Sequence, residues 1–449
     1  MSGIKVKLYF CFFVLILMAG CQQAGVKMGD PAALRNVPAQ KLSYSFEPDA
    51  LPPVESETPA SEEKAAAVQA DFDQNRPEEL LDKTVSSPDK QRILAVYHRA
   101  ADIQTEFRLD MYGADGKLLQ KISPDEMAIS LPDSITWSPD SGTVAFVGVA
   151  RAQAQPQQSQ AQPPADAPTP PEPETNSNTA ANAGTNSNGD GNANAAVNAN
   201  AATPTPAAPT SAPIKLFANE QVYTSNKDGV DLKYISQKDT LIYFYLLWSP
   251  DSTMLATLAC TPAEWQYGEL YAKTKAEIFR PFGRPRLIEK IGRERLLDDN
   301  LTVVYPAWSP DSAKVSYAFD KDVKIYDTVG DTPTYAVIPL RVPLLTSSQR
   351  YDQTLLEQEK GANAANTNAP APPANAPAPV PPANQGVQVM PNEADLVSFN
   401  PVVELRWTEE KIVYLKTGYI KEMLDSRYSS YSYMRWHKIT LSGQAAPAR

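Results

Sequence analysis

Trp137-Ser-Pro-Asp-Ser141 decides the fold, because the same five residues recur as Trp248-Ser-Pro-Asp-Ser252 and as Trp308-Ser-Pro-Asp-Ser312. A weaker copy, Ser86-Ser-Pro-Asp89, precedes the first. Another, Trp407-Thr-Glu-Glu410, keeps the tryptophan and loses the turn residues. With the low-complexity segments subtracted, the copies lie roughly 50 to 70 residues apart, within the longer range of propeller blades.

Each copy has the chemistry of a tight turn. Proline fixes φ near −65° at the first central position, aspartate suits the second, and the residue after it tends toward positive φ. Glycine is favoured at that last position, whereas the sequence places Ser141, Ser252 and Ser312 there, which costs a little strain.

Short apolar strands are predicted after these turns. The first strand of each pair follows the turn directly: 143–147, 254–258, 314–318 and 411–415. A second strand is predicted at 109–112, 222–223, 270–271 and 325–327, and 431–441 completes the last unit. A four-stranded unit cannot bury both faces alone, whereas a ring of such units can. We therefore predict an all-β, five- or six-bladed propeller of four-stranded antiparallel blades.

Composition marks the segments that interrupt or precede the blades. Residues 151–212 contain no aromatic residue and no Leu, Ile or Met, and 361–385 have the same character. Such segments bury too little surface to offset the entropy of ordering, so both are expected to be disordered inserts within a propeller spanning 81–449. Residues 21–80, rich in Pro, Ala and Glu, are interpreted as a disordered tether, although 41–46 alternate like a strand that docks.

The N-terminus has the features of an export signal. Lys5 and Lys7 precede an apolar run, 8–18, which is about 11 residues and too short to span a bilayer. The stretch Leu17-Met-Ala-Gly-Cys21 resembles a bacterial lipobox, which implies a signal peptide at 1–20 and an acylated Cys21. The alternative is an ordinary secretory signal with a chance cysteine. In lipoproteins of this kind, Gln22 implies outer-membrane sorting, so we expect a lipid-anchored protein of the cell envelope, facing the periplasm or the cell surface.

Charge and composition narrow the function. The net charge of −11 argues against a nucleic-acid partner. Cys11 leaves with the signal and Cys21 would carry lipid, so Cys260 has no cysteine with which to form an internal disulfide. The chain has two histidines, His98 and His437.

The repeated turn, together with turns such as Tyr112-Gly-Ala-Asp-Gly116, is similar to the WD40-like repeats of TolB-type periplasmic propellers. It also resembles the propellers beside prolyl-oligopeptidase-type hydrolases and certain oligogalacturonate lyases. The resemblance covers about 81–441 without the inserts, and it implies fold more than function, because the motif is structural in all these families. TolB proteins add an N-terminal α/β domain, which this sequence does not show.

The repeated tryptophans and aspartates, and the two histidines, each have a functional and a structural interpretation. Trp137, Trp248, Trp308 and Trp407 could form an aromatic ligand platform, but a large ring once per blade is typical of the core between blades. Asp140, Asp251 and Asp311, after Pro139, Pro250 and Pro310, could be metal ligands or acids, but aspartate in a tight turn usually accepts hydrogen bonds from its own backbone. His98 and His437 could meet in a closed ring, or be unrelated structural residues.

One segment departs from the blade pattern. Between residues 273 and 295 lie eight basic residues against three acidic ones, with Phe279 and Phe282 among them. We predict partner binding by Arg280, Arg284, Arg286, Lys290, Arg293 and Arg295, to an acidic protein, an anionic glycan or lipid headgroups. The alternative is a solvated hairpin edge carrying protective charges.

Two functions from different classes follow. The first is a non-enzymatic, TolB-like scaffold that binds envelope proteins or peptidoglycan-associated components. The second is a propeller enzyme acting on carbohydrate or peptide in its central channel. The sequence lacks a Gly-x-Ser-x-Gly elbow, and two histidines are too few for a metal cluster, so no catalytic residue, metal ligand or cofactor is predicted.

Overall fold

The fold is seen in a computed structural model, which describes residues 34–54, 64–100, 102, 105–151, 220–238, 240–330, 334–366 and 391–443. Cys21, the signal region and nearly all of the two predicted inserts lie outside the described residues.

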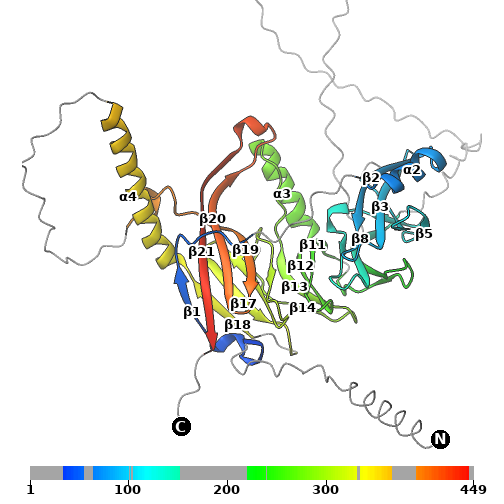
Figure 1. Cartoon of the computed structure of the whole chain (residues 1–449), viewed down its shortest axis with the longest axis horizontal. Helices are drawn as coiled ribbons and strands as arrows, with labels where there is room; N and C mark the ends of the chain where they lie inside the picture. The colour runs from blue at the N-terminus through cyan, green and yellow to red at the C-terminus, as the bar shows by residue number, and fades with distance from the viewer. Residues whose placement is uncertain are drawn as a thin grey trace, which may run out of the picture. The chain divides into compact units, whose positions relative to one another are not determined.

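Five antiparallel sheets make up the described chain, and together they have the β-propeller fold (Figure 1). The first contains β2 (Glu79–Ser86), β3 (Arg92–Arg99), β4 (Arg108–Gly113) and β5 (Leu118–Lys121). The second contains β6 (Met127–Ile129), β7 (Thr136–Trp137), β8 (Thr143–Ala150), β9 (Gln221–Asn226) and β10 (Lys233–Tyr234). The third contains β11 (Ile242–Trp248), β12 (Met254–Cys260), β13 (Arg284–Glu289) and β14 (Glu294–Leu296). The fourth contains β15 (Ala307–Trp308), β16 (Lys314–Phe319), β17 (Asp322–Asp327) and β18 (Tyr335–Pro339).

The fifth sheet pairs the first described strand with the last. Its order is β1-β21-β20-β19, in which β19 (Val402–Glu409), β20 (Ile412–Lys421) and β21 (Ser430–Gly443) are consecutive, and β1 (Leu42–Glu47) pairs with β21. The predicted strand in 41–46 is therefore confirmed, as is 431–441 as the end of the last unit.

The tether interpretation of 21–80 does not hold for its described parts. Helix α2 (Ala66–Asn75) buries Val68 and Phe72 against the face of the first sheet that points away from the second. Two short 3-10 helices, η1 (Leu34–Asn36) and η2 (Ala39–Lys41), precede β1, and Leu34 is part of the core between the fourth and fifth sheets. Helix α2 docks there because its apolar residues meet a face of the first sheet that, among the described residues, no neighbouring sheet covers.

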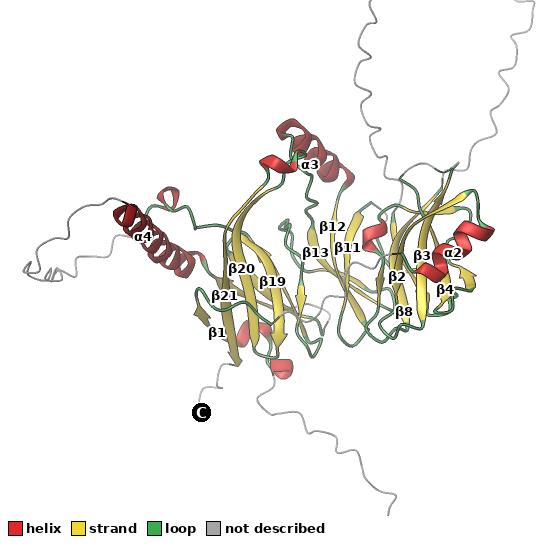
Figure 2. Cartoon of the chain, turned by 45° about the horizontal axis from the view of Figure 1, so that its top comes forward, coloured by secondary structure: helices red, strands yellow, loops and turns green. Residues whose placement is uncertain are grey.

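Core strands are buried on both faces, which explains their continuous apolar sequences. In β8, Val144 and Phe146 pack toward the first sheet, whereas Ala145 and Val147 pack toward the third. Apolar clusters join each sheet to the next along the chain; among the described residues, none joins the first sheet to the fifth. Figure 2 shows the same succession of sheets from a second direction.

The repeated turns link neighbouring sheets through their serines. Ser141, Ser252 and Ser312 have φ of 58°, 62° and 62°, as the turn chemistry predicts. Each hydroxyl accepts a hydrogen bond from a turn in the preceding sheet: Asp89 N–H to Ser141 Oγ (3.0 Å), Asp140 N–H to Ser252 Oγ (3.1 Å) and Asp251 N–H to Ser312 Oγ (3.0 Å). This hydrogen bond offsets the strain and explains why serine stands where glycine is expected.

Ser252→Ala is expected to lower the free energy of unfolding by about 1–3 kcal/mol, because it leaves the Asp140 N–H without its partner. Lys90 is a matched control, since it has φ 58° at the same turn position of the first sheet, without a hydroxyl. Lys90→Gly should instead raise stability by up to about 1 kcal/mol through relief of strain. Urea denaturation of both variants measures these changes. If Ser252→Ala leaves the free energy of unfolding unchanged, the hydrogen bond between the two turns contributes nothing to stability.

Helix α3 (Pro262–Lys275) replaces the strand predicted at 270–271, and that prediction is wrong. Thr261 and Glu264 form a reciprocal capping box, and Pro262 occupies the first turn, so the helix start was readable in the sequence. Gly268 lets α3 approach Phe279 and Phe282, because a Cβ there would lie 2.5 Å and 2.8 Å from the two rings.

Helix α4 (Arg341–Asn366) runs into the first residues of the predicted insert 361–385. Its first turns are held on the fifth sheet by Arg435 of β21, which is buried. The guanidinium donates to Ser347 (2.6 Å) and Ser348 (2.9 Å) of α4, and to both carboxylate oxygens of Asp49 (2.7 and 2.9 Å). One buried cation thus fixes α4 and the chain after β1 to the same strand.

Candidate functional site

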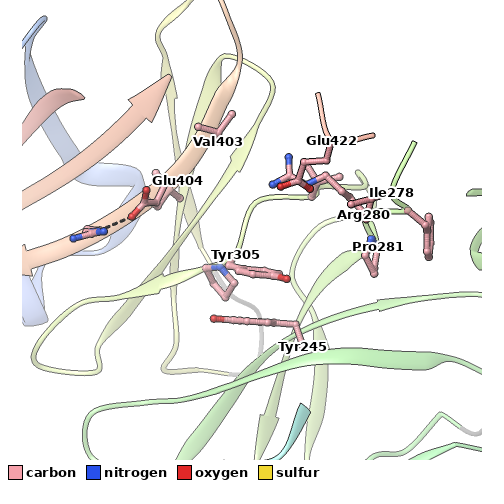
Figure 3. A pocket seen from close by; sticks show the side chains of 13 residues that line it. Tyr245, Ile278, Arg280, Pro281, Tyr305, Val403, Glu404 and Glu422 are labelled. Carbon is pink, nitrogen blue, oxygen red and sulfur yellow. Dashed lines mark hydrogen bonds and ion pairs between the residues drawn. The ribbon is translucent and has the colours of Figure 1, made fainter. Parts of the chain in front are cut away.

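A cavity of about 500 Å³ lies between the third sheet, the chain before β15 and the fifth sheet (Figure 3). We call it the cleft. Its walls come from β11, the chain after α3, residues 303–306, β19 and the chain just after β20. The lining residues are Tyr245, Ile278, Phe279, Arg280, Pro281, Val303, Tyr305, Pro306, Val403, Glu404, Leu405, Arg406 and Glu422. The cleft therefore collects side chains from elements far apart in sequence.

Two parallel tyrosine rings form one wall. Tyr245 and Tyr305 stack with centroids 3.9 Å apart and planes 7° apart, and Tyr305 is 53% exposed. Burial, with the neighbouring Tyr305 hydroxyl, raises the pKa of Tyr245 to about 12, so its hydroxyl stays protonated at neutral pH. The stack offers a flat, partly solvated surface on which a ring or a planar group can lie.

Two β-bulges shape the walls. The β11–β12 register shifts between Tyr243 and Tyr245, and the β19–β20 register shifts between Val402 and Glu404. A bulge bends its strand and redirects the next side chains. The bulged strands supply Tyr245 on one wall and Val403 and Glu404 on the other.

Two arginine–glutamate pairs give the cleft its polar groups. Arg406 donates to Glu404 (Nε–Oε1 2.6 Å), and its guanidinium lies 5.2 Å from the centre of the Trp436 ring. Arg280 Nε lies 3.5 Å from Glu422 Oε2, and the Tyr431 hydroxyl donates to the other oxygen of Glu422. The two pairs keep the net charge of the cleft close to zero. They also leave cationic hydrogen-bond donors and anionic acceptors beside the tyrosines.

Backbone pairing holds the end of α3 against the hairpin between β20 and β21. Ile278 N–H donates to Glu422 C=O and Leu424 N–H to Ala276 C=O, each at 2.9 Å. Figures 1 and 2 both show α3 beside this hairpin. Arg280 and Glu422 are therefore fixed by the chain itself and do not depend on their own weak ion pair.

A second cavity of about 610 Å³ adjoins the cleft, and the two share Arg280, Val303 and Val403. Between them, residues 301–306 alternate: Leu301, Val303 and Tyr305 are exposed, whereas Thr302 and Val304 are buried. Thr302 pairs with Gly283 in both directions and donates its hydroxyl to Ala318 C=O (2.6 Å). The exposed side chains thus stand on a firmly held backbone.

The repeated tryptophans lie in the cores between sheets. The indoles of Trp137, Trp248 and Trp308 donate to carbonyls of the preceding sheet: Val85 (3.2 Å), Thr136 (3.4 Å) and Leu247 (3.1 Å). Trp407 differs, because it donates to Glu410 in its own turn (3.3 Å). In each intact turn the aspartate accepts from the turn serine, as in Asp140 with Ser138, Asp251 with Ser249 and Asp311 with Ser309.

The structure does not bring the two histidines together. His98 lies in the first sheet, where Nδ1 is 2.7 Å from Asp82. His437 is fully buried in the fifth sheet, stacked on Phe46. Its Nδ1 accepts from Asp49 N–H (3.2 Å), so Nε2 carries the proton toward Thr417 (2.9 Å). Burial, followed by the charge of Arg435, lowers the pKa of His437 to about 4.

The six basic residues predicted to bind a partner are dispersed. Arg284 binds both oxygens of Glu264 at 2.8 Å, which helps lower the pKa of that carboxyl to about 2. The others have local partners too: Arg286 pairs with Glu294, Arg293 with Glu289, Arg295 donates to Gly330 C=O, and Lys290 lies 5.9 Å from the Trp248 ring. Arg280 is the member that lines the cleft.

Within the described ranges, no group of three or more His, Cys, Asp or Glu side chains is arranged to hold a metal ion. None of the helices in those ranges is both long and apolar enough to span a membrane.

Tyr245, Tyr305 and Glu404 were not among the residues predicted from the sequence, although a signal for them is present. Each lies three residues before a repeated tryptophan, namely Trp248, Trp308 and Trp407. That shared position places all three on the cleft wall. Comparing residues at equal offsets from the repeat would have singled them out.

No family model matches the chain, and no curated protein matches it. Among solved structures, it is similar to prolyl oligopeptidase B from Galerina marginata bound to a 25-residue macrocyclization substrate, with a TM-score of 0.36 and 9% identity over 88% of this chain and 41% of that one. It is similar to an oligogalacturonate lyase in complex with manganese, with a TM-score of 0.27 and 9% identity over 58% and 48%. It is also similar to the β-propeller domain of the trilobed protease from Pyrococcus furiosus, with a TM-score of 0.20 and 8% identity over 76% and 79%.

The chain spans less than half the length of the first two of these structures. At these identities and TM-scores the likeness carries no information on activity. Of the three, the trilobed-protease structure is the one described as a β-propeller domain.

Proposed function

We propose that this propeller is a non-enzymatic, TolB-like binding protein of the cell envelope, and that the cleft holds a segment of a partner protein. The observation that carries the proposal is the stacked pair Tyr245 and Tyr305, set between two arginine–glutamate pairs in one cavity. Tyrosine and arginine dominate the energetically important residues of protein interfaces, because they combine large contact area with directional hydrogen bonds.

The cleft fits a segment that brings an aromatic or proline ring to the tyrosines and polar groups to the pairs. The ion pair between Arg280 and Glu422 is weak, because its atoms are 3.5 Å apart and both side chains are partly exposed. A carboxylate of the partner can therefore replace Glu422 beside Arg280, and an amide can bind either residue, at small cost in free energy. Arg406 is held more firmly, by Glu404 and Trp436. The expected ligand therefore contacts Arg280 directly and stacks on Tyr305.

The envelope location rests on the lipobox-like stretch that ends at Cys21. Acyl chains on that cysteine, at about 0.8 kcal/mol for each buried methylene, would hold the chain permanently at a membrane. The described chain begins at residue 34, so only a short stretch separates this anchor from the propeller. Envelope proteins and peptidoglycan-associated components are then the partners within reach.

The test is photo-crosslinking in intact cells, with benzoylphenylalanine in place of Tyr305. Tyr335 is the matched control, since it is similarly exposed and does not line the cleft. We expect a defined protein adduct from position 305 and none from position 335. With the captured protein purified, Tyr305→Ala should weaken binding by about tenfold or more, and Tyr335→Ala by less than about twofold.

Cys21→Ser separates location from recognition in the same experiment. The variant should move to the soluble envelope fraction and lose the adduct in cells, while binding the purified partner as wild type does. Equal adducts from positions 305 and 335, or unchanged affinity after Tyr305→Ala, would show that the cleft is not the binding site.

A second candidate function is hydrolysis of a carbohydrate or peptide in the cleft. The specific observation in its favour is that two carboxylates, Glu404 and Glu422, line one cavity. Paired carboxylates carry glycoside hydrolysis. Turnover of a glycan or peptide library that disappears in both Glu404→Gln and Glu422→Gln would establish the enzyme; turnover that survives both changes would exclude these residues.

A further inference from the structure

The chain that leads from Cys21 is fastened to one end of the propeller. The Leu34 N–H donates to Glu410 Oε1 (2.9 Å), and the Leu34 side chain lies in the core between the fourth and fifth sheets. Lys314, which is 2% exposed, donates from Nζ to Val37 C=O (2.7 Å). The first described residues are therefore part of the fold, held by the core and by a buried cation.

These contacts lie at the end of the sheets that carries the repeated turns, which we call the turn end. Glu410 lies in the turn between β19 and β20, and Lys314 begins β16, directly after the turn at 309–312. The repeated turns are hydrogen-bonded from sheet to sheet through their serines, so they lie together on one side of the propeller. The chain from Cys21 thus meets the propeller at its turn end.

The cleft opens at the opposite end. Helix α3 connects β12 to β13 away from the repeated turn, and Ile278, after α3, donates its N–H to Glu422 C=O, after β20. Strand β20 has 10 residues and separates Glu422 from the turn end by about 33 Å, at the usual rise of a strand. In Figure 1 the dark blue segment before β1 and helix α3 lie at opposite ends of the fifth sheet.

A lipid on Cys21 would lie close to the turn end. Cys21 and Leu34 are 13 positions apart, and 13 residues span at most about 45 Å, whatever their conformation. The turn end can rest on the anchoring bilayer at any extension of this linker. The cleft end can touch the same bilayer only if the linker runs back along the height of the propeller, over most of its maximum span.

The turn end carries two aliphatic tips. Ile291, in the turn between β13 and β14, and Val329, after β17, are 85% and 73% exposed and border one cavity of about 430 Å³. The backbone N–H of the residue before each tip is held beside a repeated turn, by the carbonyls of Thr253 (3.0 Å) and Ala313 (3.1 Å). Exposed aliphatic side chains on an ordered backbone bind to the boundary between lipid headgroups and acyl chains.

Charges of both signs surround the tips and select the kind of lipid. The charged side chains in or beside the turns include Asp140, Asp251, Asp311, Lys90, Lys227 and Lys290. Phosphatidylethanolamine offers a phosphate to the lysines and an ammonium group to the aspartates, whereas an anionic headgroup offers the aspartates only repulsion. The turn end is therefore complementary to a zwitterionic membrane surface.

We infer that the turn end rests on the bilayer that anchors Cys21, with Ile291 and Val329 among the lipid headgroups, and that the cleft opens away from this bilayer. The inference rests on the acylation of Cys21 that is part of the proposed function. It adds a direction to that function, because a partner reaches the cleft from the aqueous side and not through the anchoring membrane.

Photo-crosslinking to lipid tests the orientation. The chain from residue 21 is coupled through Cys21 to a maleimide lipid in vesicles of phosphatidylethanolamine and phosphatidylcholine. Cys260 does not compete, because it is 1% exposed and burial raises its pKa to about 12. Benzoylphenylalanine in place of Ile291 should form a lipid adduct. In place of Tyr267, which is 67% exposed on α3, it should form at least about tenfold less.

Moving the anchor is the matched control. A chain with Cys21→Ser and Leu424→Cys is coupled instead through the hairpin between β20 and β21, where residue 424 is 69% exposed. The preference should then reverse, with the larger lipid adduct at position 267. This reversal shows that both positions report contact with lipid.

A change at the second tip tests the contact itself. With the anchor at Cys21, Val329→Asp should lower the adduct from position 291 more than about threefold, because it sets a carboxylate against the apolar boundary. Val342→Asp is the matched control, since residue 342 is 59% exposed at the start of α4, and should leave the adduct unchanged. Circular dichroism of each variant distinguishes loss of contact from loss of folding.

Three outcomes overturn the inference with the anchor at Cys21. They are the absence of a lipid adduct at position 291, equal adducts at positions 291 and 267, and an adduct at 291 that Val329→Asp leaves unchanged. Acylation is measured separately, from the mass of the N-terminal peptide of the chain isolated from cells. Its absence would remove the proposed envelope location, whereas the orientation on vesicles, where maleimide coupling replaces acylation, would stand or fall by the adducts.

Discussion

Trp308→Ala is expected to lower the free energy of unfolding by about 3–5 kcal/mol. Trp308 is buried in the cluster between the third and fourth sheets, with Leu258, Leu287 and Val315. The truncation leaves a cavity in that cluster, and it removes the indole N–H that donates to Leu247 C=O at 3.1 Å. Denaturation in urea, followed by circular dichroism, measures the loss.

Phenylalanine substitutions separate packing from the hydrogen bond. Trp308→Phe keeps most of the apolar volume but deprives Leu247 of its donor in the neighbouring sheet. Trp407→Phe is the matched control, because the Trp407 indole donates within its own turn, to Glu410. We expect Trp308→Phe to cost about 1–2 kcal/mol more than Trp407→Phe. Equal losses would mean that the hydrogen bond between sheets contributes nothing beyond packing.

Stability is expected to fall by about 3 kcal/mol as the pH drops from about 6.5 to about 4, through His437 alone. The pKa of this histidine is near 6.5 when unfolded and about 4 in the folded chain. Between these values the unfolded chain binds a proton that the folded chain does not, so acid favours unfolding. The geometry agrees, since Nδ1 accepts from Asp49 N–H and has no room for a proton.

His437→Asn isolates this contribution. The amide oxygen can still accept from Asp49 N–H, but the side chain no longer titrates. We expect the variant to be less stable than wild type at pH 7.5, where it loses the contact with Thr417, and the two curves to converge toward pH 4. Free energies of unfolding at pH 7.5, 6, 5 and 4 provide the comparison. Curves that stay parallel would place the acid sensitivity elsewhere.

The fold was readable because one turn recurs with its strands in register. The predictions at 143–147, 254–258 and 314–318 fall within β8, β12 and β16, which extend each by one to three residues. The positive φ after each aspartate was readable too. The repeat did not predict the hydrogen bond that each turn serine accepts from a backbone N–H of the preceding sheet. That contact joins residues 52 to 112 positions apart, so no local pattern reports it.

The cleft was harder to predict, because its lining residues share a place in the repeat and do not form a segment of unusual composition. Tyr245 and Tyr305 look like ordinary strand residues until their shared offset from a tryptophan is noticed. The basic segment was conspicuous in sequence, yet Arg284 and Arg286 are turned to Glu264 and Glu294. Local charge density could not predict the pairing of Arg284, because Glu264 lies 20 residues earlier, at the start of α3, and the sequence predicted a strand at 270–271.

Pairing β1 with β21 makes the fifth sheet the last of the five described sheets that synthesis can complete. β1 leaves the ribosome before the other described strands and its partner β21 after them, with Ser43 bonded to Ser442 across 399 residues. Until then β1 is an unpaired strand, and the apolar side of β20 lacks its final neighbour. This sheet therefore stays incomplete until β21 has been synthesised, and a truncation that removes either β1 or β21 should leave it without a strand.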